Sequence, residues 1–327
     1  MSSMPVRDVP KKAQLLTRHP FWRCKYRNFF SFFKSLLIKI PFFCLILSFR
    51  MLFSPLYPTY QTYMNHPSIH FSRPRWIFFD LDDTLWDFNS NSLKSLLFIF
   101  NRFSIISSIF GNFDSFVHQY RIHNSKLWEE HARGMISSSF LKTERWRRTL
   151  FPDLLPERVP VICRNIDAEY LDYLANQTDI AVNAIEVLHC LSRHFMIGVI
   201  SNGFKDTQYK KLYNSGLWRY VTRMVISDEI AIQKPDPRIF RHAIRETGAS
   251  GIPVMVGDNP EADILGALQA GWDAIWFNSR DMDFPFSEDE LRCRGINPDS
   301  FLGTARNMED VSRILQMRMS GKHLLQN

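Results

Sequence analysis

Five short apolar segments most strongly constrain how this 327-residue chain can fold. They are residues 76–80 (WIFFD), 196–201 (MIGVIS), 223–227 (RMVIS), 253–258 (PVMVGD) and 274–277 (AIWF). Apolar runs of this length are typical of strands that are buried on both faces of a sheet. Amphipathic stretches at about 204–216, 236–248 and 261–271 separate the later runs, and each ends at a glycine, as helices often do. This alternation predicts an α/β fold with a doubly wound parallel sheet.

One long segment interrupts the alternation between the first two runs. Residues 90–180 contain no convincing strand, but they show helical patterns at about 91–106, 111–132, 137–150 and 157–176. An all-helical insertion of this length predicts a cap subdomain over the strand ends. We therefore expect three parts: a core of residues 71–89 and 181–327, a cap of residues 90–180, and an N-terminal extension of residues 1–70 that need not be structured.

Residues 28–58 of the extension form the most hydrophobic stretch of the chain. A helix that crosses a membrane needs about 20 largely apolar residues, but two lysines and an arginine interrupt this stretch, and Pro41 lies within its longest uncharged part. Three interpretations remain open: an interfacial membrane anchor, a targeting segment, or sequence upstream of the true start. The last is suggested by Met51 and Met64, which both precede the first motif described below.

The distribution of charge indicates whether a nucleic-acid partner is expected, and the cysteines indicate the cellular compartment. Residues 1–75 hold twelve of the 40 lysines and arginines and one of the 33 acidic residues, which leaves 28 basic and 32 acidic residues for the remainder. The net charge of +7 therefore belongs to the extension, and we expect no nucleic-acid partner. None of the five cysteines forms a CxxC pair, which predicts reduced thiols and a cytoplasmic protein.

Polar residues follow the predicted strands at four places. In a parallel sheet the carboxyl ends of the strands meet at one edge, where ligands bind. We therefore expect these side chains to converge on one site. They are Asp80, Asp82 and Thr84 after the first strand, Ser201 and Asn202 at the end of the second, Lys234 before the helix that follows the third, and Asp258 and Asp263 after the fourth.

This combination of residue types suits phosphoryl transfer. A carboxylate can accept the phosphoryl group and so divide one difficult displacement into two easier ones. A second carboxylate two residues later can protonate the leaving alcohol and then activate water. A hydroxyl group, a lysine and a cation can offset the charge of the phosphoryl oxygens, and carboxylates favour Mg²⁺ as that cation.

The same residues resemble the four ordered motifs of the haloacid dehalogenase (HAD) superfamily. The resemblance covers about residues 75–280, through Asp80-x-Asp82-x-Thr84, Ser201, Lys234 and Gly257-Asp258-x-x-x-x-Asp263. The helical insertion between the first two motifs is similar to the cap of the dehalogenase-like subgroup. The resemblance therefore implies a Rossmann-like core with a helical cap.

The resemblance also implies a role for each residue. Asp80 would be the nucleophile and a magnesium ligand, and Asp82 the general acid and base, with its backbone carbonyl on the metal. An aspartate at position 82 further implies a phosphatase or a phosphomutase, because dehalogenases lack an acid there. The phosphate-binding and supporting set would be Thr84, Ser201, Asn202 and Lys234, and the other metal-site residues would be Asp258 and Asp263.

Longer segments resemble the pyrimidine 5′-nucleotidase branch of the superfamily. They are WIFFDLDDTLWDF, SNGF, VISDEIAIQKPDPRIF and VMVGDNPEADILGALQAGWDAIWFN. The resemblance implies a Mg²⁺-dependent phosphomonoesterase that acts on nucleoside 5′-monophosphates. Two alternatives stay open: a phosphatase for phosphoglycolate or a sugar phosphate, and a membrane-peripheral binding protein that uses residues 28–58. One departure concerns the cap hinge, where Val182-Asn183-Ala184 replaces the usual Pro-Gly.

Substrate specificity in such an enzyme has to come from the cap, because the core contacts mainly the phosphoryl group. An aromatic side chain there could stack on a nucleobase, or it could simply pack between helices. The candidates are Asn124, Trp128, Arg133 and Trp146.

Overall fold

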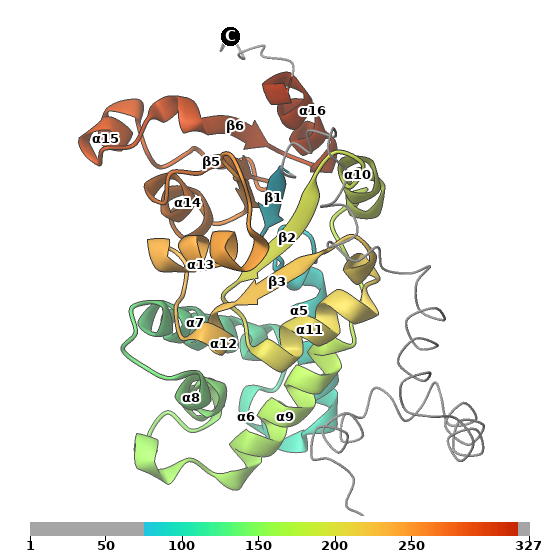
Figure 1. Cartoon of the computed structure of the whole chain (residues 1–327). Coiled ribbons are helices and arrows are strands. Elements are labelled where there is room, and N and C mark those ends of the chain that lie inside the picture. The colour runs from blue at the N-terminus through green and yellow to red at the C-terminus, as the bar shows by residue number, and fades with distance from the viewer. Residues whose placement is uncertain (1–74, 320–327) are drawn as a thin grey trace, which may run out of the picture. The chain divides into compact units, whose positions relative to one another are not determined.

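The computed structural model describes residues 75–319, which all belong to one compact unit (Figure 1). The expected extension, including the apolar residues 28–58, lies outside these described residues. Between residues 75 and 319 no single helix is long and apolar enough to cross a membrane, although one pair of helices bent by 97° passes the same test of length and composition. The three cysteines of this range, Cys163, Cys190 and Cys293, are free thiols.

The core is a six-stranded parallel sheet, which confirms the predicted fold class. Its strands are β1 (Trp76–Phe79), β2 (Met196–Ser201), β3 (Arg223–Ile226), β4 (Val254–Gly257), β5 (Asp273–Phe277) and β6 (Phe301–Ala305). The strand order is β3-β2-β1-β4-β5-β6, so the chain winds outward first on one side of β1 and then on the other. The switch between β1 and β4 opens a crevice at the carboxyl ends of the strands, where ligands bind in such sheets.

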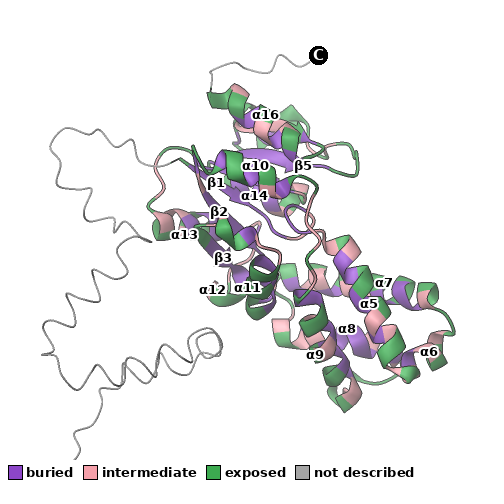
Figure 2. Ribbon diagram, turned by 90° about the vertical axis from the view of Figure 1, so that its right-hand side faces the viewer, coloured by how far each residue is buried: buried purple, intermediate pink, exposed green. Residues whose placement is uncertain are grey.

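Strand β1 shows why a continuous apolar run is required. Ile77 and Phe79 pack into the hydrophobic cluster on one face of the sheet, whereas Trp76 and Phe78 pack into the cluster on the other face. Gly198 of the neighbouring strand β2 makes room for Phe78, since a Cβ atom there would lie 2.4 Å from the phenyl ring. The buried residues in Figure 2 accordingly run along the strands.

Helices cover both faces of the sheet (Figure 1). Helices α10 (Ala184–Leu191) and α16 (Met308–Met319) contact each other on one side, and α13 (Pro237–Thr247) and α14 (Gly266–Gln269) contact each other on the other. The remaining core helices are α11 (Lys205–Asn214), α12 (Ser227–Ile230), α15 (Glu288–Cys293) and the short 3₁₀ turns η2 (Leu217–Arg219) and η4 (Pro298–Ser300). The helix expected at 261–271 is instead a π-helical turn, η3 (Pro260–Leu265), that runs directly into α14.

The insertion between β1 and β2 consists of helices, as expected. They are α5 (Phe88–Arg102), α6 (Ser104–Phe110), α7 (Phe113–Ala132), α8 (Ser138–Leu150), the 3₁₀ turn η1 (Pro156–Arg158) and α9 (Val161–Ala175). The single helix expected at 91–106 is divided at Phe103, whose backbone is extended. Figure 2 shows a second buried zone among these helices, where the rings of Tyr120, Trp146 and Tyr170 pack together.

Two chain segments connect core and insertion side by side. The Asp87 amide donates to the Asp179 carbonyl at 3.1 Å, and the Ala181 amide donates to the Leu85 carbonyl at 3.0 Å. Asn183, which stands where Pro-Gly is usual, has a left-handed backbone with φ of 59°. Asparagine tolerates this conformation better than most residues, so it supplies the backbone turn for which glycine is normally used.

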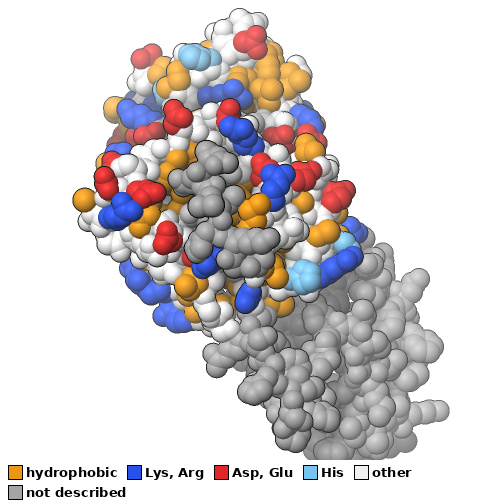
Figure 3. Space-filling view, turned by 90° about the horizontal axis from the view of Figure 1, so that it is seen from above, with side chains coloured by type: hydrophobic (Ala, Val, Ile, Leu, Met, Phe, Trp, Pro, Cys, Tyr) orange, Lys and Arg blue, Asp and Glu red, His pale blue; other side chains and the backbone are white. Residues whose placement is uncertain are grey.

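Positively and negatively charged side chains are interspersed on the surface of the described residues. On the face in Figure 3, lysine and arginine side chains alternate with aspartate and glutamate over the described residues. Several charged side chains of residues 75–319 form ion pairs, as Arg292 does with Glu288 and Asp289, and Arg318 with Asp273.

Candidate active site

The sheet brings most of the predicted site residues to one pocket. Asp80 directly follows β1, Ser201 ends β2, and Asp258 directly follows β4. Lys234 comes from the segment before α13, and Asp263 comes from the π-helical turn η3. All five line a pocket of about 280 Å³ whose other wall is formed by residues of α7, α8 and α9. The pocket therefore lies between the carboxyl ends of the strands and the helical insertion.

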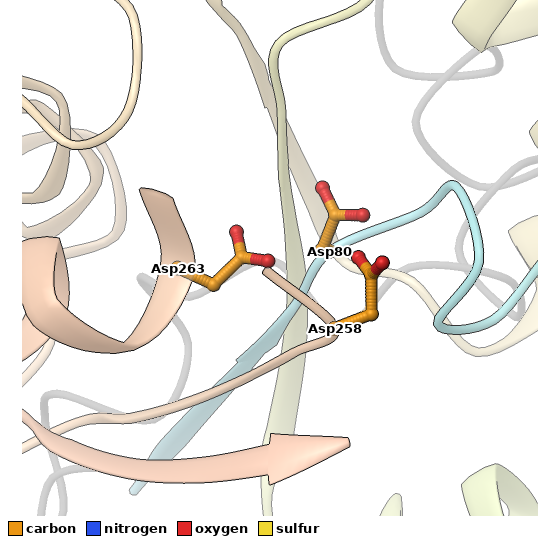
Figure 4. A group of neighbouring side chains, drawn as sticks. All are labelled: Asp80, Asp258 and Asp263. Carbon is orange, nitrogen blue, oxygen red and sulfur yellow. The ribbon is translucent and has the colours of Figure 1, made fainter. Parts of the chain in front are cut away.

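Three carboxylates form the floor of this pocket (Figure 4). Asp80, Asp258 and Asp263 each offer one oxygen, and these oxygens lie within 4.8 Å of one another. Burial, together with the neighbouring acids, raises the pKa of Asp80 to about 7, although Lys234 opposes this effect. Burial, with the charges of Asp263 and Asp80, raises the pKa of Asp258 to about 9. When all three carboxyl groups are ionised, the cluster holds more negative charge than its one lysine neutralises, which is why the pKa values of Asp80 and Asp258 are raised.

Such a cluster fits a hard divalent cation. Carboxylate oxygens are the ligands that Mg²⁺ prefers, and Mg²⁺ typically binds through one or two carboxylates and keeps several waters. A cation would also favour the ionised forms of Asp80 and Asp258, which burial disfavours. The side chain of Asp82 is not a member of this cluster; its predicted backbone contact with the metal stays a prediction.

Lys234 is buried between two of the acids. Its Nζ forms ion pairs with Asp80 and with Asp263, the latter at 2.6 Å, and it donates to the carbonyl of Ile200 at 2.7 Å. Burial lowers the pKa of Lys234, but the negative charges of Asp263 and Asp80 together raise it by more than burial lowers it. The net shift is therefore upward, and the side chain stays charged. The ammonium group therefore provides a fixed positive charge beside Asp80.

The second strand contributes Ser201 and Asn202 in different ways. Ser201 is 2% exposed, and its hydroxyl accepts hydrogen bonds from Gln208 at 2.7 Å and from the Gly203 amide at 3.3 Å. The side chain of Asn202 accepts from the Lys234 amide at 2.8 Å and donates to the Lys234 carbonyl at 2.9 Å. Asn202 thus fixes the backbone that carries the lysine.

Asp82 also lines this pocket, but its carboxylate forms hydrogen bonds with a different set of residues. Its Oδ2 accepts from Gln208 Nε2 at 2.7 Å, and its Oδ1 accepts from Lys211 Nζ at 2.6 Å. The remaining predicted residue, Thr84, is fully buried and does not line the pocket. Its hydroxyl has no hydrogen-bond partner, and its place is in the loop that follows Asp82.

The helical insertion supplies a wall of aromatic, aliphatic and polar side chains. Of the four predicted specificity residues, Asn124 and Trp128 line the pocket, whereas Arg133 and Trp146 do not. Arg133 is exposed at the end of α7, and Trp146 is fully buried among the helices, where its indole donates to Asp167. The pocket is also lined by Arg145 and Tyr170 of the insertion helices, by Phe88 at the start of α5 and by Phe204 of the core, which the sequence alone did not single out.

Comparison with known proteins identifies the family. The family model described as haloacid dehalogenase-like hydrolase matches residues 74–271, more than half of the chain. The chain is 29% identical to pyrimidine 5′-nucleotidase YjjG of Escherichia coli (strain K12) over 238 residues, which cover 72% of this chain and 96% of the relative. It is also 29% identical to glyceraldehyde 3-phosphate phosphatase of Methanothermobacter thermautotrophicus over 211 residues, or 62% of this chain and 85% of the relative.

A solved structure shows the same fold. The magnesium-bound HAD-hydrolase YfnB from Bacillus subtilis has a TM-score of 0.62 to this structure at 24% identity, covering 75% of this chain and 99% of that one. The chain therefore belongs to the haloacid dehalogenase-like hydrolase family, as its motifs predicted. It is a hydrolase. The resemblance to pyrimidine 5′-nucleotidases that the sequence predicted is confirmed by the similarity to YjjG.

Proposed function

We propose that this protein is a Mg²⁺-dependent phosphomonoesterase that forms an aspartyl-phosphate and acts on nucleoside 5′-monophosphates. The observation that carries the proposal is the placement of two carboxylates in one pocket with different surroundings. Asp80 lies in the acidic cluster beside the Lys234 ammonium. Asp82 lies outside that cluster and accepts hydrogen bonds from Gln208 and Lys211. Two carboxylates in unlike environments are suited to different tasks.

In the first step, an Asp80 oxygen attacks phosphorus and the bond from phosphorus to the ester oxygen breaks. The proton of the Asp82 carboxyl group moves to that oxygen, so the product leaves as an alcohol. In the second step, Asp82 takes a proton from water as the water oxygen attacks phosphorus. The bond between phosphorus and Asp80 breaks, and inorganic phosphate, free Asp80 and protonated Asp82 result.

The remaining residues bind and orient the phosphoryl group. Lys234 and the Ser201 hydroxyl are the cationic and neutral donors for its oxygens, and Asn202 holds Lys234 in place. Asp80, Asp258 and Asp263 would hold Mg²⁺, with Asp263 supporting the site through its ion pair to Lys234. When bound, the cation offsets the charge of the phosphoryl oxygens. Thr84 would stabilise the loop after Asp82.

The shape and lining of the pocket support a planar leaving group. Trp128 and Phe204 both line the pocket, and their ring centroids lie 5.2 Å apart. Asn124 Oδ1 is buried without a hydrogen-bond partner, and the guanidinium of Arg145 is anchored on Asp167. Aromatic faces with one acceptor and one donor suit a nucleobase. The relative YjjG, named a pyrimidine 5′-nucleotidase, supports the same substrate class.

A sugar phosphate is the second candidate substrate. The observation in its favour is the similarity, at equal identity, to a glyceraldehyde 3-phosphate phosphatase. A small sugar would use Arg145 and Asn124 but leave the aromatic wall without contact.

A substrate panel distinguishes the two candidates. The purified protein with Mg²⁺ is assayed for phosphate release from uridine, thymidine and adenosine 5′-monophosphates, glyceraldehyde 3-phosphate and phosphoglycolate. We expect kcat/KM to be highest for a nucleotide, and Trp128→Leu to lower it about ten-fold for nucleotides while changing it little for phosphoglycolate, because stacking on a base contributes about 1–3 kcal/mol. A preference for glyceraldehyde 3-phosphate or phosphoglycolate would overturn the nucleotide assignment.

A further inference from the structure

Gln208 of helix α11 connects two residues of the site. Its side chain is almost fully buried, and its Nε2 donates both to Asp82 Oδ2 and to Ser201 Oγ, each at 2.7 Å. Gly203 makes room for it, because a Cβ atom there would lie 1.9 Å from Gln208 Nε2. The chain thus keeps a glycine where any larger residue would displace this amide.

Lys211, one helical turn later on the same face of α11, holds the other oxygen of Asp82. Its Nζ lies 2.6 Å from Asp82 Oδ1, and its side chain is 3% exposed. The ammonium also lies 4.3 Å from the centroid of the Trp86 ring and 5.3 Å from that of Phe88. Burying an ammonium group costs free energy unless it is paired, so a lysine at this place needs a specific reason.

We infer that Gln208 and Lys211 are positioning residues that aim the Asp82 carboxyl group at the leaving-group oxygen. The inference rests on the proposed function. Each carboxylate oxygen has two lone-pair sites, so one donor on each oxygen fixes the plane of the group and leaves a site free to carry the proton. Lys211 also offsets the negative charge that remains on Asp82 after its proton has moved to the leaving group.

The leaving group separates this role from a merely structural one. An alkoxide is a poor leaving group and needs the proton of Asp82, whereas p-nitrophenolate leaves readily without one. A structural defect lowers the folded fraction and so lowers both rates by the same factor. Misplacement of Asp82 lowers the rate of the first step, the release of the leaving group, selectively for the alkyl ester, whereas the second step, in which Asp82 activates water, is common to both esters. The ratio of the two first-step rates does not depend on how much of a preparation is folded.

The experiment measures, for the full chain with Mg²⁺, the rate at which the leaving group is released in a single turnover on two substrates. The alkyl ester is uridine 5′-monophosphate, or the best alkyl phosphate of the panel above, and the aryl ester is p-nitrophenyl phosphate. The variants are Gln208→Met and Lys211→Met, which keep the bulk of each side chain but remove its donor. Lys211→Arg restores a charged donor, and Lys210→Met is the control, since Lys210 is a half-exposed neighbour paired with Asp172 of α9.

We expect Gln208→Met and Lys211→Met to lower the single-turnover rate of leaving-group release about 10- to 100-fold for the alkyl ester and less than about three-fold for the aryl ester, because general acid catalysis contributes about 10²- to 10⁴-fold. Lys211→Arg should recover part of the alkyl rate, and Lys210→Met should match wild type. An equal fall on both substrates, or no fall, overturns the inference while wild-type activity upholds the proposed function. If the wild type hydrolyses neither ester, the proposed function itself fails.

Discussion

Asn202 illustrates how a residue that touches no reacting atom can set the geometry of the site. The resemblance placed Asn202 in the phosphate-binding and supporting set, and its side chain forms two hydrogen bonds with the backbone of Lys234, 32 residues away. The amide spans the gap between the end of β2 and the segment before α13. The position of the Lys234 ammonium beside Asp80 depends on this link.

Replacing Asn202 with leucine should therefore impair activity more than stability. The Lys234 amide and carbonyl lose their partners, which costs about 1–3 kcal/mol, and we expect kcat/KM to fall at least about ten-fold as the lysine shifts. Asn214→Leu is the matched control, because Asn214 also donates from its side chain to a backbone carbonyl, that of Ala175 at 2.9 Å, away from the lysine. Thermal unfolding and phosphate release are measured on both. Equal activity losses in the two variants would refute the positioning of Lys234 by Asn202.

At the scale of elements, the turn after β4 decides where the metal-site carboxylates lie. The π-helical turn η3 places Asp263 against the last residue of the strand, where a Cβ atom on Gly257 would lie 2.3 Å from its carboxyl group. Asp263 Oδ2 also accepts from the Asn259 amide at 3.0 Å. The wider turn and the glycine together bring Asp258 and Asp263 to the same side.

Gly257→Ala should consequently weaken metal binding. The added methyl group displaces Asp263, and overpacking of this kind costs about 1–3 kcal/mol. The rise in melting temperature caused by Mg²⁺ should shrink, because a ligand stabilises only as far as it binds. Val254→Ala, at the other end of the same strand and remote from the pocket, should lose stability but keep the full Mg²⁺ response. An unchanged response in Gly257→Ala would contradict the role assigned to this turn.

How much of the fold was predictable depends on the setting of each element. Strands buried on both faces, such as β1 and β2, can be recognised in the sequence as continuous apolar runs. All five runs predicted in this way are strands in the structure. Strand β6 was missed because it lies at the edge of the sheet, is only partly buried and contains Gly303. Helices α10 and α16 were also not predicted, and the width of the π-helical turn cannot be read from periodicity.

The site was predictable to a similar extent. Residues at strand ends were found from their order in the sequence, because parallel topology brings those ends together. Gln208 and Lys211 were not found, since their partner Asp82 lies 126 and 129 residues away and a polar residue on an amphipathic helix usually faces solvent. Arg145 was missed for the same reason: only packing against Asp167 in a neighbouring helix shows that it is buried.

At the scale of the whole enzyme, two side-chain contacts join the insertion to the core in addition to the connecting chain segments. Gln233, next to Lys234, contacts the ring of His131 in α7 at 2.9 Å, and Ser138 of α8 donates to Asp228 at 2.7 Å. These contacts lie apart from the paired segments at Asp87 and Ala181 that connect the two parts. The insertion is thus attached to the core close to Lys234, for which we propose a role in holding the phosphoryl group, and this suits a cap that encloses the leaving group.

Phosphate release by the wild type and by Asp80→Asn tests the central claim most directly. Asparagine keeps the size of the side chain but is a poor nucleophile, so an aspartyl-phosphate cannot form. With Mg²⁺ and the best substrate of the panel, we predict steady turnover by the wild type, its loss on adding a chelator, and a fall of at least about 10³-fold in Asp80→Asn, since removing a nucleophile leaves only binding and electrostatic effects. Wild-type turnover by folded Asp80→Asn would contradict the account.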